Sequence, residues 1–282
     1  MKKIKQPAKA YKNSDFLNSA SGRSIRILSE FFEPKARFKK FSIVDTIVVF
    51  GSARLKSKKE ALKNYNDIKK LDPEATPDFP QKLRAAQKLL EMSRYYEETV
   101  ELTRKLTEWS LNLPVEENRF IVCSGGGPGI MEAANKGAKI AGGYSVGLNI
   151  SLPFEQYANK YVTPELSFEF HYFFMRKFWF VYLAKALIIF PGGFGTLDEL
   201  MEVLTLVQTE KIRKQMKIII YDEKYWRKIL NFDALIEYGT IGEDDMKLFN
   251  FAATPQEAFE LITAHFEKYY LRKRDGKKSV SL

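Results

Sequence analysis

The chain has 282 residues, of which 45% are hydrophobic and 28% are charged, and its formal net charge at pH 7 is +10. This composition predicts a globular protein with a sizeable core, built as one α/β domain with additions or as two small domains. The single cysteine, Cys123, excludes an intrachain disulfide framework and fits a reducing compartment. We therefore expect a cytoplasmic protein.

The sequence does not favour a membrane or a nucleic acid as partner. The most apolar stretch, Phe170–Phe190, contains Arg176, Lys177 and Lys185, which a membrane span would tolerate poorly. Much of the positive charge lies near the two ends of the chain, where basic tails usually stay solvated. No helix-turn-helix, zinc-finger or RNP-type motif accompanies them.

The first part of the chain predicts an extension, a strand and an insertion. Residues 1–40 form a basic N-terminal extension in which we expect one short helix, at Ser24–Phe32. The β-branched run Ile43–Phe50 predicts the first buried strand. The lysine-rich residues 55–91 indicate an insertion that runs over the surface, and an amphipathic helix follows it, with Ser93 as its N-cap.

The rest of the chain alternates strands with helices. We expect strands at Phe120–Cys123, Tyr144–Ile150, Ala186–Phe190 and Met216–Tyr221, and helices at Ile130–Ala141, Phe168–Leu183, Leu197–Thr209 and Lys224–Tyr238. Thr254–Glu257 has the sequence of a capping box, with proline at the first helical position. Apolar strands that alternate with helices predict an α/β fold: a Rossmann-like parallel sheet with helices on both faces. We assign this domain to residues 41–270 and a basic tail to residues 271–282.

Three glycine-containing loops each follow a predicted strand. Glycine also permits tight turns, so each loop could be no more than a turn between a strand and a helix. Because the carboxyl ends of parallel strands share one edge of a sheet, the three loops can instead face one crevice and offer backbone N–H groups to a phosphate. The candidate substrate-binding residues in these loops are Gly51, Ser52, Gly125, Gly126, Gly127, Gly129, Gly192, Gly193, Gly195 and Thr196.

The spacing of the glycines narrows the class of phosphate-containing ligand. Counted from Gly125, the third glycine position of G-x-G-x-x-G is occupied by Ile130, and no acidic residue closes the next strand, so a dinucleotide site is not favoured. Neither of the two glycine-rich loops, at residues 125–129 and 192–195, continues into the G-K-[ST] of a P-loop. The remaining candidate ligands are a mononucleotide and a sugar phosphate.

Glu199 and Arg176 are the candidate catalytic side chains. Glu199 follows Thr196 at capping-box spacing, so its carboxylate could simply cap a helix. It could instead stabilise the positive charge that develops at the anomeric carbon of a ribose during glycosidic cleavage. Arg176 lies in an apolar helix, where a charge must be paired, reach a cavity or extend to the surface. A pair between Arg176 and Glu199 would satisfy both charges. The two histidines and one cysteine give no metal signature.

These residues carry a resemblance to a known family. Pro191–Glu199 reads PGGFGTLDE and is similar to the PGGxGTxxE signature of the LOG (Lonely Guy) family, which is often labelled "lysine decarboxylase". The resemblance covers about residues 43–215 and includes Gly51–Arg54, Tyr95–Glu98 and Ser124–Ala134. It implies a Rossmann-like, commonly dimeric hydrolase that cleaves nucleoside 5′-monophosphates to a free base and ribose 5-phosphate. AMP and cytokinin riboside monophosphates are the typical substrates of that family.

The resemblance also assigns roles. Arg176 and Glu199 fall on the family's catalytic residues, Lys177 lies beside Arg176 as a substrate contact, and no metal or organic cofactor is implied. Phe173–Lys177 keeps the Arg and Lys of the family's MHxRK segment but has Phe in place of its Met and His, which leaves the base open. No lysine is marked as the Schiff-base residue that a pyridoxal-phosphate decarboxylase needs. The alternative class is a non-catalytic protein that binds or carries a nucleotide or a molybdenum cofactor.

Overall fold

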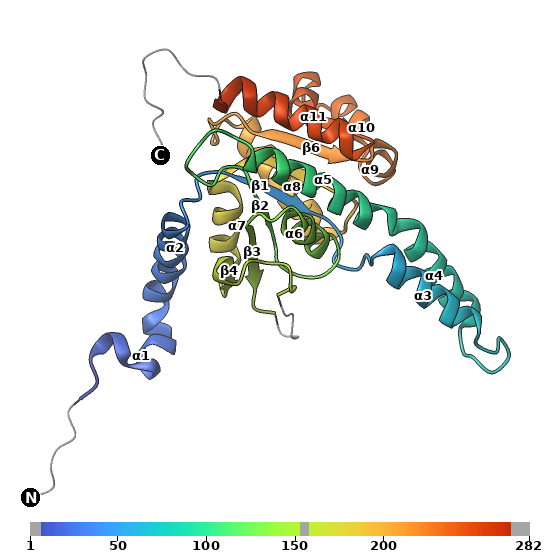
Figure 1. The fold of residues 1–282 in the computed structure, drawn as a ribbon, viewed down its shortest axis with the longest axis horizontal. Helices are drawn as coiled ribbons and strands as arrows, with labels where there is room; N and C mark the ends of the chain where they lie inside the picture. Colours follow the sequence, from blue (N-terminus) through green and yellow to red (C-terminus); the bar gives the residue numbers. More distant parts are fainter. Residues whose placement is uncertain (1–6, 153–157, 272–282) are drawn as a thin grey trace, which may run out of the picture.

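The computed structural model describes residues 7–152 and 158–271, and a parallel sheet lies at its centre (Figure 1). Seven strands of the described chain pair in the order β4-β3-β2-β1-β5-β6-β7, and every pairing is parallel. The strands are β1 (Thr46–Phe50), β2 (Ile121–Ser124), β3 (Ser145–Ile150), β4 (Ser167–Phe170), β5 (Ala184–Ile189), β6 (Lys217–Tyr221) and β7 (Asn250–Ala252). The predicted α/β fold with a parallel sheet is confirmed.

Helices cover both faces of the sheet. Three helices pack on one face of the sheet: α5 (Arg94–Leu111), α6 (Ile130–Ile140) and α11 (Pro255–Phe266). The opposite face bears α2 (Arg23–Lys40), α7 (Phe173–Tyr182), α8 (Phe194–Gln208), α9 (Glu223–Ile229) and α10 (Phe232–Glu237). The other helices are α1 (Ser14–Asn18), α3 (Lys58–Lys69) and α4 (Phe79–Met92).

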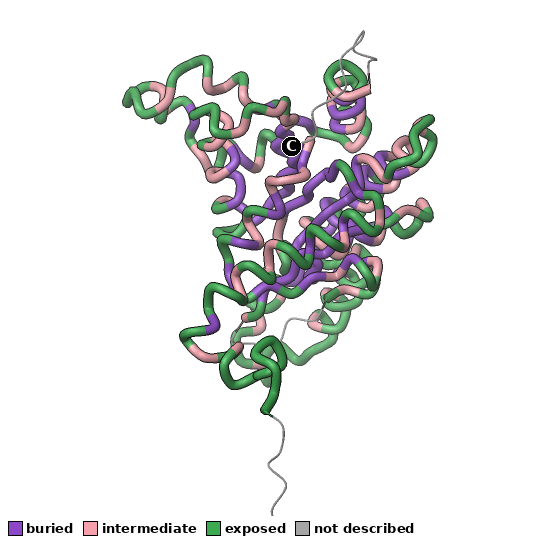
Figure 2. The backbone as a smooth tube through the Cα atoms, turned by 90° about the vertical axis from the view of Figure 1, so that its left-hand side faces the viewer, coloured by how far each residue is buried: buried purple, intermediate pink, exposed green. Residues whose placement is uncertain are grey.

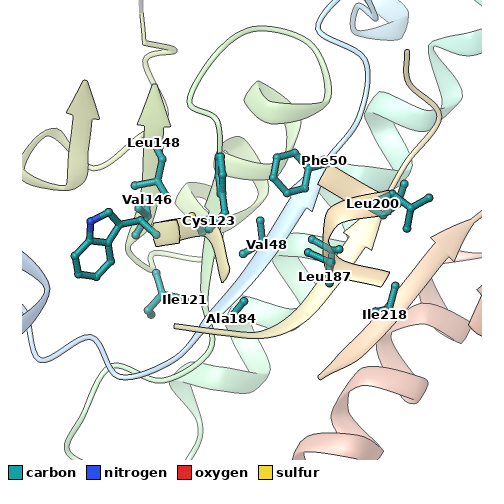
Figure 3. Close-up of a cluster of buried hydrophobic side chains, with 14 of the residues drawn as sticks. Val48, Phe50, Ile121, Cys123, Val146, Leu148, Ala184, Leu187, Leu200 and Ile218 are labelled. Atoms are coloured by element: carbon teal, nitrogen blue, oxygen red, sulfur yellow. The ribbon is translucent and has the colours of Figure 1, made fainter. Parts of the chain in front are cut away.

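Alternation along the strands divides the core into two layers. In β1, Val48 and Phe50 point to the α7 and α8 side, whereas Ile47 and Val49 point to the α5 and α6 side. Figure 3 shows the first of these layers, where Val48 lies among side chains of the neighbouring strands and Cys123 belongs to the same cluster. Figure 2 shows the buried backbone concentrated at the centre of the molecule. Cys123 is a buried thiol whose pKa is raised by burial.

The predicted helix at Phe168–Leu183 is wrong at its start. Its first residues form β4, which pairs in parallel with β3, and α7 begins only at Phe173. Phe168 and Phe170 are buried while Glu169 between them is exposed, which is the two-residue period of a strand. A short edge strand followed directly by an aromatic helix reads in the sequence as one apolar run.

The helix of the N-terminal extension is longer than predicted and enters the core. α2 continues through Pro34, and its Phe38 ring packs 5.1 Å from the Phe168 ring and 5.3 Å from the Trp179 ring, centroid to centroid. Pro34 has no N–H to donate to the carbonyl of Glu30, four residues earlier. That carbonyl accepts the indole N–H of Trp179 at 2.9 Å instead. The proline thereby frees the acceptor that joins α2 to α7.

The insertion consists of two helices that the sequence did not reveal. α3 and α4 form a hairpin beside the start of α5 and extend away from the sheet (Figure 1). Ser93 does not cap α5; its backbone is helical and its hydroxyl donates to the carbonyl of Leu90. The predicted basic C-terminal tail falls almost wholly on residues 272–282, outside the described residues.

The structure bears on the C-terminal part of the predictions in three ways. The helix expected at Lys224–Tyr238 is two helices, α9 and α10, because the backbone is extended at Leu230 and the Asn231 side chain caps α10. Strand β7 was not predicted. The expected cap of the last helix is confirmed, since the Thr254 hydroxyl accepts the N–H of Glu257. In the part of the chain described here, no helix combines the length and the hydropathy needed to cross a membrane.

Candidate functional site

The three glycine-containing loops meet at one point of the sheet edge. β1 lies between β2 and β5, and the strand order changes direction there, as at the ligand-binding switch point of open α/β sheets. The Ser52 N–H donates to the carbonyl of Pro191 at 3.0 Å, and the Ile130 N–H donates to the carbonyl of Ser52 at 3.1 Å. The Gly51-Ser52 segment therefore joins the other two loops, so the three loops lie side by side at this edge of the sheet.

Glycine is required where the first two loops touch. Gly129 has φ = 70°, in the left-handed region, and a Cβ atom there would lie 2.3 Å from the carbonyl oxygen of Ser52. A Cβ atom on Gly51 would lie 2.7 Å from the Ile130 side chain. The glycines of these two loops thus permit close backbone packing as well as a ligand approach.

The third loop runs directly into helix α8. The helix begins at Phe194, earlier than predicted, with Gly193 as its N-cap, so Gly195 and Thr196 lie in its first turn. A Cβ atom on Gly193 or Gly195 would meet nothing within 4 Å, so the backbone there is open to the surroundings. Among the described residues, the N–H groups of Phe194 and Gly195 have no acceptor, as is usual for the first turn of a helix. Such a helix start is suited to an anion.

The capping-box interpretation of Glu199 is wrong. Thr196 is the third residue of α8 rather than its N-cap, and no side chain caps this helix. Glu199 lies in the second turn, and only 3% of its surface is exposed. Helix capping therefore does not account for the burial of this carboxylate.

Burial sets the charge state of Glu199. Desolvation raises the pKa of its carboxyl to about 7, against the opposing effect of Lys177 and Arg176. The Lys177 ammonium lies 3.9 Å from Glu199 Oε1. A buried carboxylate that titrates near neutrality beside two cations is the kind of group that catalytic sites contain.

Lys177 connects α7 to α8 through three carboxylates. Its Nζ lies 2.8 Å from Asp198 Oδ2 and 2.6 Å from Glu202 Oε2, in addition to the contact with Glu199. Desolvation opposes these partners, but the pKa of Lys177 is raised on balance, so the lysine stays protonated. Lys177 therefore fixes the two helices to each other at the site.

Arg176 is not paired with Glu199 as the sequence suggested. Within residues 7–152 and 158–271 no ion pair closer than 4.0 Å joins them, and Lys177 is the cation in contact with the carboxylate. Successive residues of a helix point about 100° apart, so both cannot face the same oxygen equally well. The guanidinium carbon of Arg176 lies 5.3 Å from the Phe173 ring centroid and 5.5 Å from that of Phe180.

The electrostatics of Arg176 still tie it to the site. Burial lowers the pKa of its guanidinium, while Glu199, Asp198 and Glu169 act in the opposite direction. Its Nε is buried and has no hydrogen-bond partner in the described structure. Arg176 therefore has an unsatisfied donor close to Glu199.

Two residues near the loops carry no sequence motif and were missed. The hydroxyl of Tyr225 donates to the carbonyl of Gly192 at 3.0 Å. The amide of Asn159 donates to the carbonyls of Gly126 and Gly127, each at 3.0 Å. Both residues lie outside the glycine loops, in segments whose contact with the site depends on tertiary folding. Among the described residues, no group of three or more His, Cys, Asp or Glu side chains could hold a metal ion.

Comparison with known proteins shows which proteins this chain is similar to. The family model described as "Possible lysine decarboxylase" matches residues 131–262. The chain is 31% identical over 94 residues to "Cytokinin riboside 5′-monophosphate phosphoribohydrolase LOG" of Oryza sativa subsp. japonica, covering 33% of this chain and 39% of that protein. It is 26% identical over 178 residues to "Probable cytokinin riboside 5′-monophosphate phosphoribohydrolase LOGL6" of the same organism, covering 62% of this chain and 66% of that protein. The chain thus spans less than two thirds of the length of the curated relatives that it matches.

Solved structures match this chain at low identity and with TM-scores below 0.5. The structure of TM1055 is 20% identical and covers 78% of this chain and 99% of its own, with a TM-score of 0.46. The molybdenum cofactor binding protein from Rippkaea orientalis is 17% identical and covers 79% of this chain and 95% of its own, with a TM-score of 0.45. Together, the family model and the curated relatives confirm the resemblance to the LOG family that the Pro191–Glu199 segment predicts.

Proposed function

We propose that this protein hydrolyses the N-glycosidic bond of a nucleoside 5′-monophosphate and releases a free base and ribose 5-phosphate. The relatives named phosphoribohydrolase support this class of reaction. The observation that carries the proposal is the buried Glu199 carboxylate, one helical turn beyond the open N–H groups at the start of α8. A phosphate bound at the helix start would bring the attached ribose towards Glu199.

The roles of the residues follow from charge. The open backbone at Gly193 and Gly195, with the first turn of α8, would bind the 5′-phosphate. As the bond between the anomeric carbon and the base nitrogen breaks, its electron pair leaves with the base and positive charge develops on the ribose. The Glu199 carboxylate would stabilise that charge and orient the water whose oxygen bonds to the anomeric carbon. That water would lose one proton as the C–O bond forms, and the departing base nitrogen would gain one, which gives the free base and ribose 5-phosphate. Arg176, with its free donor, would position the ribose and assist departure of the base.

The test is direct. The protein is incubated with a panel of nucleoside 5′-monophosphates, including AMP and a cytokinin riboside monophosphate, and free base is measured by chromatography. We expect base release from at least one of them, with the best substrate defining the base preference that the sequence leaves open. Intact nucleotide after long incubation, together with saturable binding, would support the non-catalytic nucleotide or molybdenum-cofactor carrier instead.

The surface of α7 and α2 supports a homodimer. Five large apolar side chains on these helices are between 36% and 58% exposed: Leu28, Phe32, Phe173, Phe174 and Phe178. An exposed apolar patch of this kind favours association. Analytical sedimentation of the wild type and of Phe178→Lys tests the proposed homodimer. If the dimer forms through this patch, the variant should dissociate into monomers more readily than the wild type. A cytoplasmic location is likewise a proposal, which cell fractionation checks.

A further inference from the structure

We propose that Tyr225 and Asn159 are positioning residues that orient the glycine loops for the anion of the substrate, an inference that rests on the proposed function. Tyr225 donates to the Gly192 carbonyl of the third loop. Asn159 donates to the Gly126 and Gly127 carbonyls of the second. In the second and the third loop, therefore, at least one carbonyl oxygen is held by a side chain from outside the loop.

The geometry of the peptide group explains why this matters. In a trans peptide, the carbonyl of one residue and the N–H of the next point in opposite directions. Because Tyr225 holds the Gly192 carbonyl, the N–H of Gly193 is directed away from Tyr225. By the same reasoning, the contact with Asn159 directs the N–H of Gly127 away from Asn159.

Both of these N–H groups are free. Neither has an acceptor in the described parts of the chain, whereas the N–H of Gly126, the residue before Gly127, is bonded to the Ser124 hydroxyl at 3.1 Å. In the third loop the free N–H of Gly193 is followed by those of Phe194 and Gly195, and successive free N–H groups can make an anion-binding concavity. If a carbonyl rotated into that space, its oxygen would repel a phosphate. The two side-chain donors oppose this rotation.

Tyr225 is itself held by a chain of contacts from the opposite face of the sheet. The Asp222 carboxylate accepts the Tyr225 N–H at 3.1 Å and the Tyr95 hydroxyl at 2.5 Å, and it pairs with Arg94. Asp222 has φ = 69°, a conformation that non-glycine residues rarely adopt. Strained residues of this kind persist where the surroundings fix them, often at functional sites. The start of α5 thus fixes the end of β6, which presents Tyr225 to the loop.

Asn159 is anchored in a buried polar network. The two N–H groups of its side-chain amide are shared among three acceptors, since Asn135 Oδ1 also lies 2.9 Å from Nδ2. The backbone N–H of Asn159 donates to the Gly126 carbonyl at 2.7 Å. Asn135 is fully buried and bridges the Ser124 hydroxyl and the Val146 carbonyl. A network satisfied in this way is rigid, so the position of Asn159 is well defined.

The experiment compares Tyr225→Phe with Tyr270→Phe. Each variant removes one tyrosine hydroxyl that donates to a backbone carbonyl, but Tyr270 contacts Gln215 beside α11. Ribose 5-phosphate is titrated into each protein by calorimetry, and hydrolysis is measured for a nucleoside monophosphate and for the matching nucleoside. We expect Tyr225→Phe to weaken ribose 5-phosphate binding about five- to tenfold and Tyr270→Phe to change it less than about twofold. The kcat/KM for the nucleoside without phosphate should be the same in Tyr225→Phe and the wild type.

The outcomes separate this inference from the proposed function. If the wild type binds ribose 5-phosphate and Tyr225→Phe binds it equally well, the positioning role is overturned and the proposed function stands. If the wild type neither binds ribose 5-phosphate nor releases a base, both are overturned. Asn159→Ala should weaken binding in the same direction, and Tyr225→Phe remains decisive if the alanine variant folds poorly.

Discussion

At the scale of one residue, the burial of Glu199 lowers the stability of the folded protein at neutral and higher pH. In the folded protein its pKa is about 7, against an ordinary value of 4.5. Between these values the folded state holds a proton that the unfolded state has lost. The contribution of Glu199 to the free energy of unfolding therefore falls as the pH rises from 4.5 to 7, and the loss is complete above pH 7.

Glu199→Gln should consequently be more stable than the wild type at pH 8. A shift of this size corresponds to a gain of at most about 3 kcal/mol. The gain should disappear near pH 4, where both side chains are neutral. Denaturant unfolding at the two pH values measures it, with Glu117→Gln, an exposed glutamate in the loop after α5, as the control. A Glu199→Gln protein that is less stable at pH 8 would contradict the assigned burial effect.

Arg176 and Lys177 should respond differently to substitution. Lys177 contacts three carboxylates, so Lys177→Met leaves them without their cation and should lower the free energy of unfolding by about 1–3 kcal/mol. Arg176 has a buried donor without a partner, so Arg176→Ala should cost little stability while lowering kcat/KM about 100-fold or more. Thermal unfolding and kinetics on one substrate check both. Equal losses of activity and stability in the two variants would argue against separate roles.

At the scale of the element, the start of α8 combines a tight contact with an open one. The Gly192 backbone packs on Thr196, whereas Gly195 faces open space. The sequence predicts an anion site in this segment, which stays a prediction, and it places the helix start three residues late. Spacing alone could not show that Gly193 is the N-cap, because Thr196 is the better capping residue by type.

Two alanine substitutions in this segment should have opposite consequences. A Cβ atom on Gly192 would lie 2.1 Å from Thr196 Oγ1 and 2.7 Å from Thr196 Cβ, so Gly192→Ala should destabilise the protein by about 1–3 kcal/mol. Gly195→Ala adds a methyl group to an open helical position and should keep or slightly raise the melting temperature. It should nonetheless weaken ribose 5-phosphate binding, because the methyl group enters the space proposed for the phosphate. Unchanged binding by Gly195→Ala would place the phosphate elsewhere.

At the scale of the whole molecule, the five central strands of the sheet were predictable, whereas its two edge strands and the additions to the sheet were not. Continuous apolar runs such as Ile43–Phe50 identify buried parallel strands, and the position of the three loops at their carboxyl ends follows from parallel topology. The edge strand β4 and the division between α9 and α10 depend on tertiary pairing, which a single sequence does not display. The same holds for Tyr225 and Asn159. The partner of Tyr225 is 33 residues away in the chain, and the two partners of Asn159 are 33 and 32 residues away.

The α3–α4 hairpin should be dispensable for the sheet. Its base is closed by a hydrogen bond from the Lys58 N–H to Glu97 Oε1 of α5, at 2.9 Å, so a short Gly-Ser linker can replace residues 59–91. We expect the shortened protein to fold and to keep its activity, with a lower melting temperature because α5 loses its contacts with α3 and α4. Circular dichroism and the base-release assay check this. Loss of the cooperative unfolding transition would show that the hairpin belongs to the folding core.

The central claim is that Glu199 performs chemistry on a nucleoside monophosphate. The most direct measurement is the rate of base release by the wild type and by Glu199→Gln, on the best substrate of the panel, between pH 6 and pH 8.5. The account predicts that kcat/KM of the wild type rises with pH through about 7 as the carboxyl loses its proton, and that Glu199→Gln is at least about 100-fold slower at every pH. A Glu199→Gln protein that is folded and releases base at the wild-type rate would contradict it.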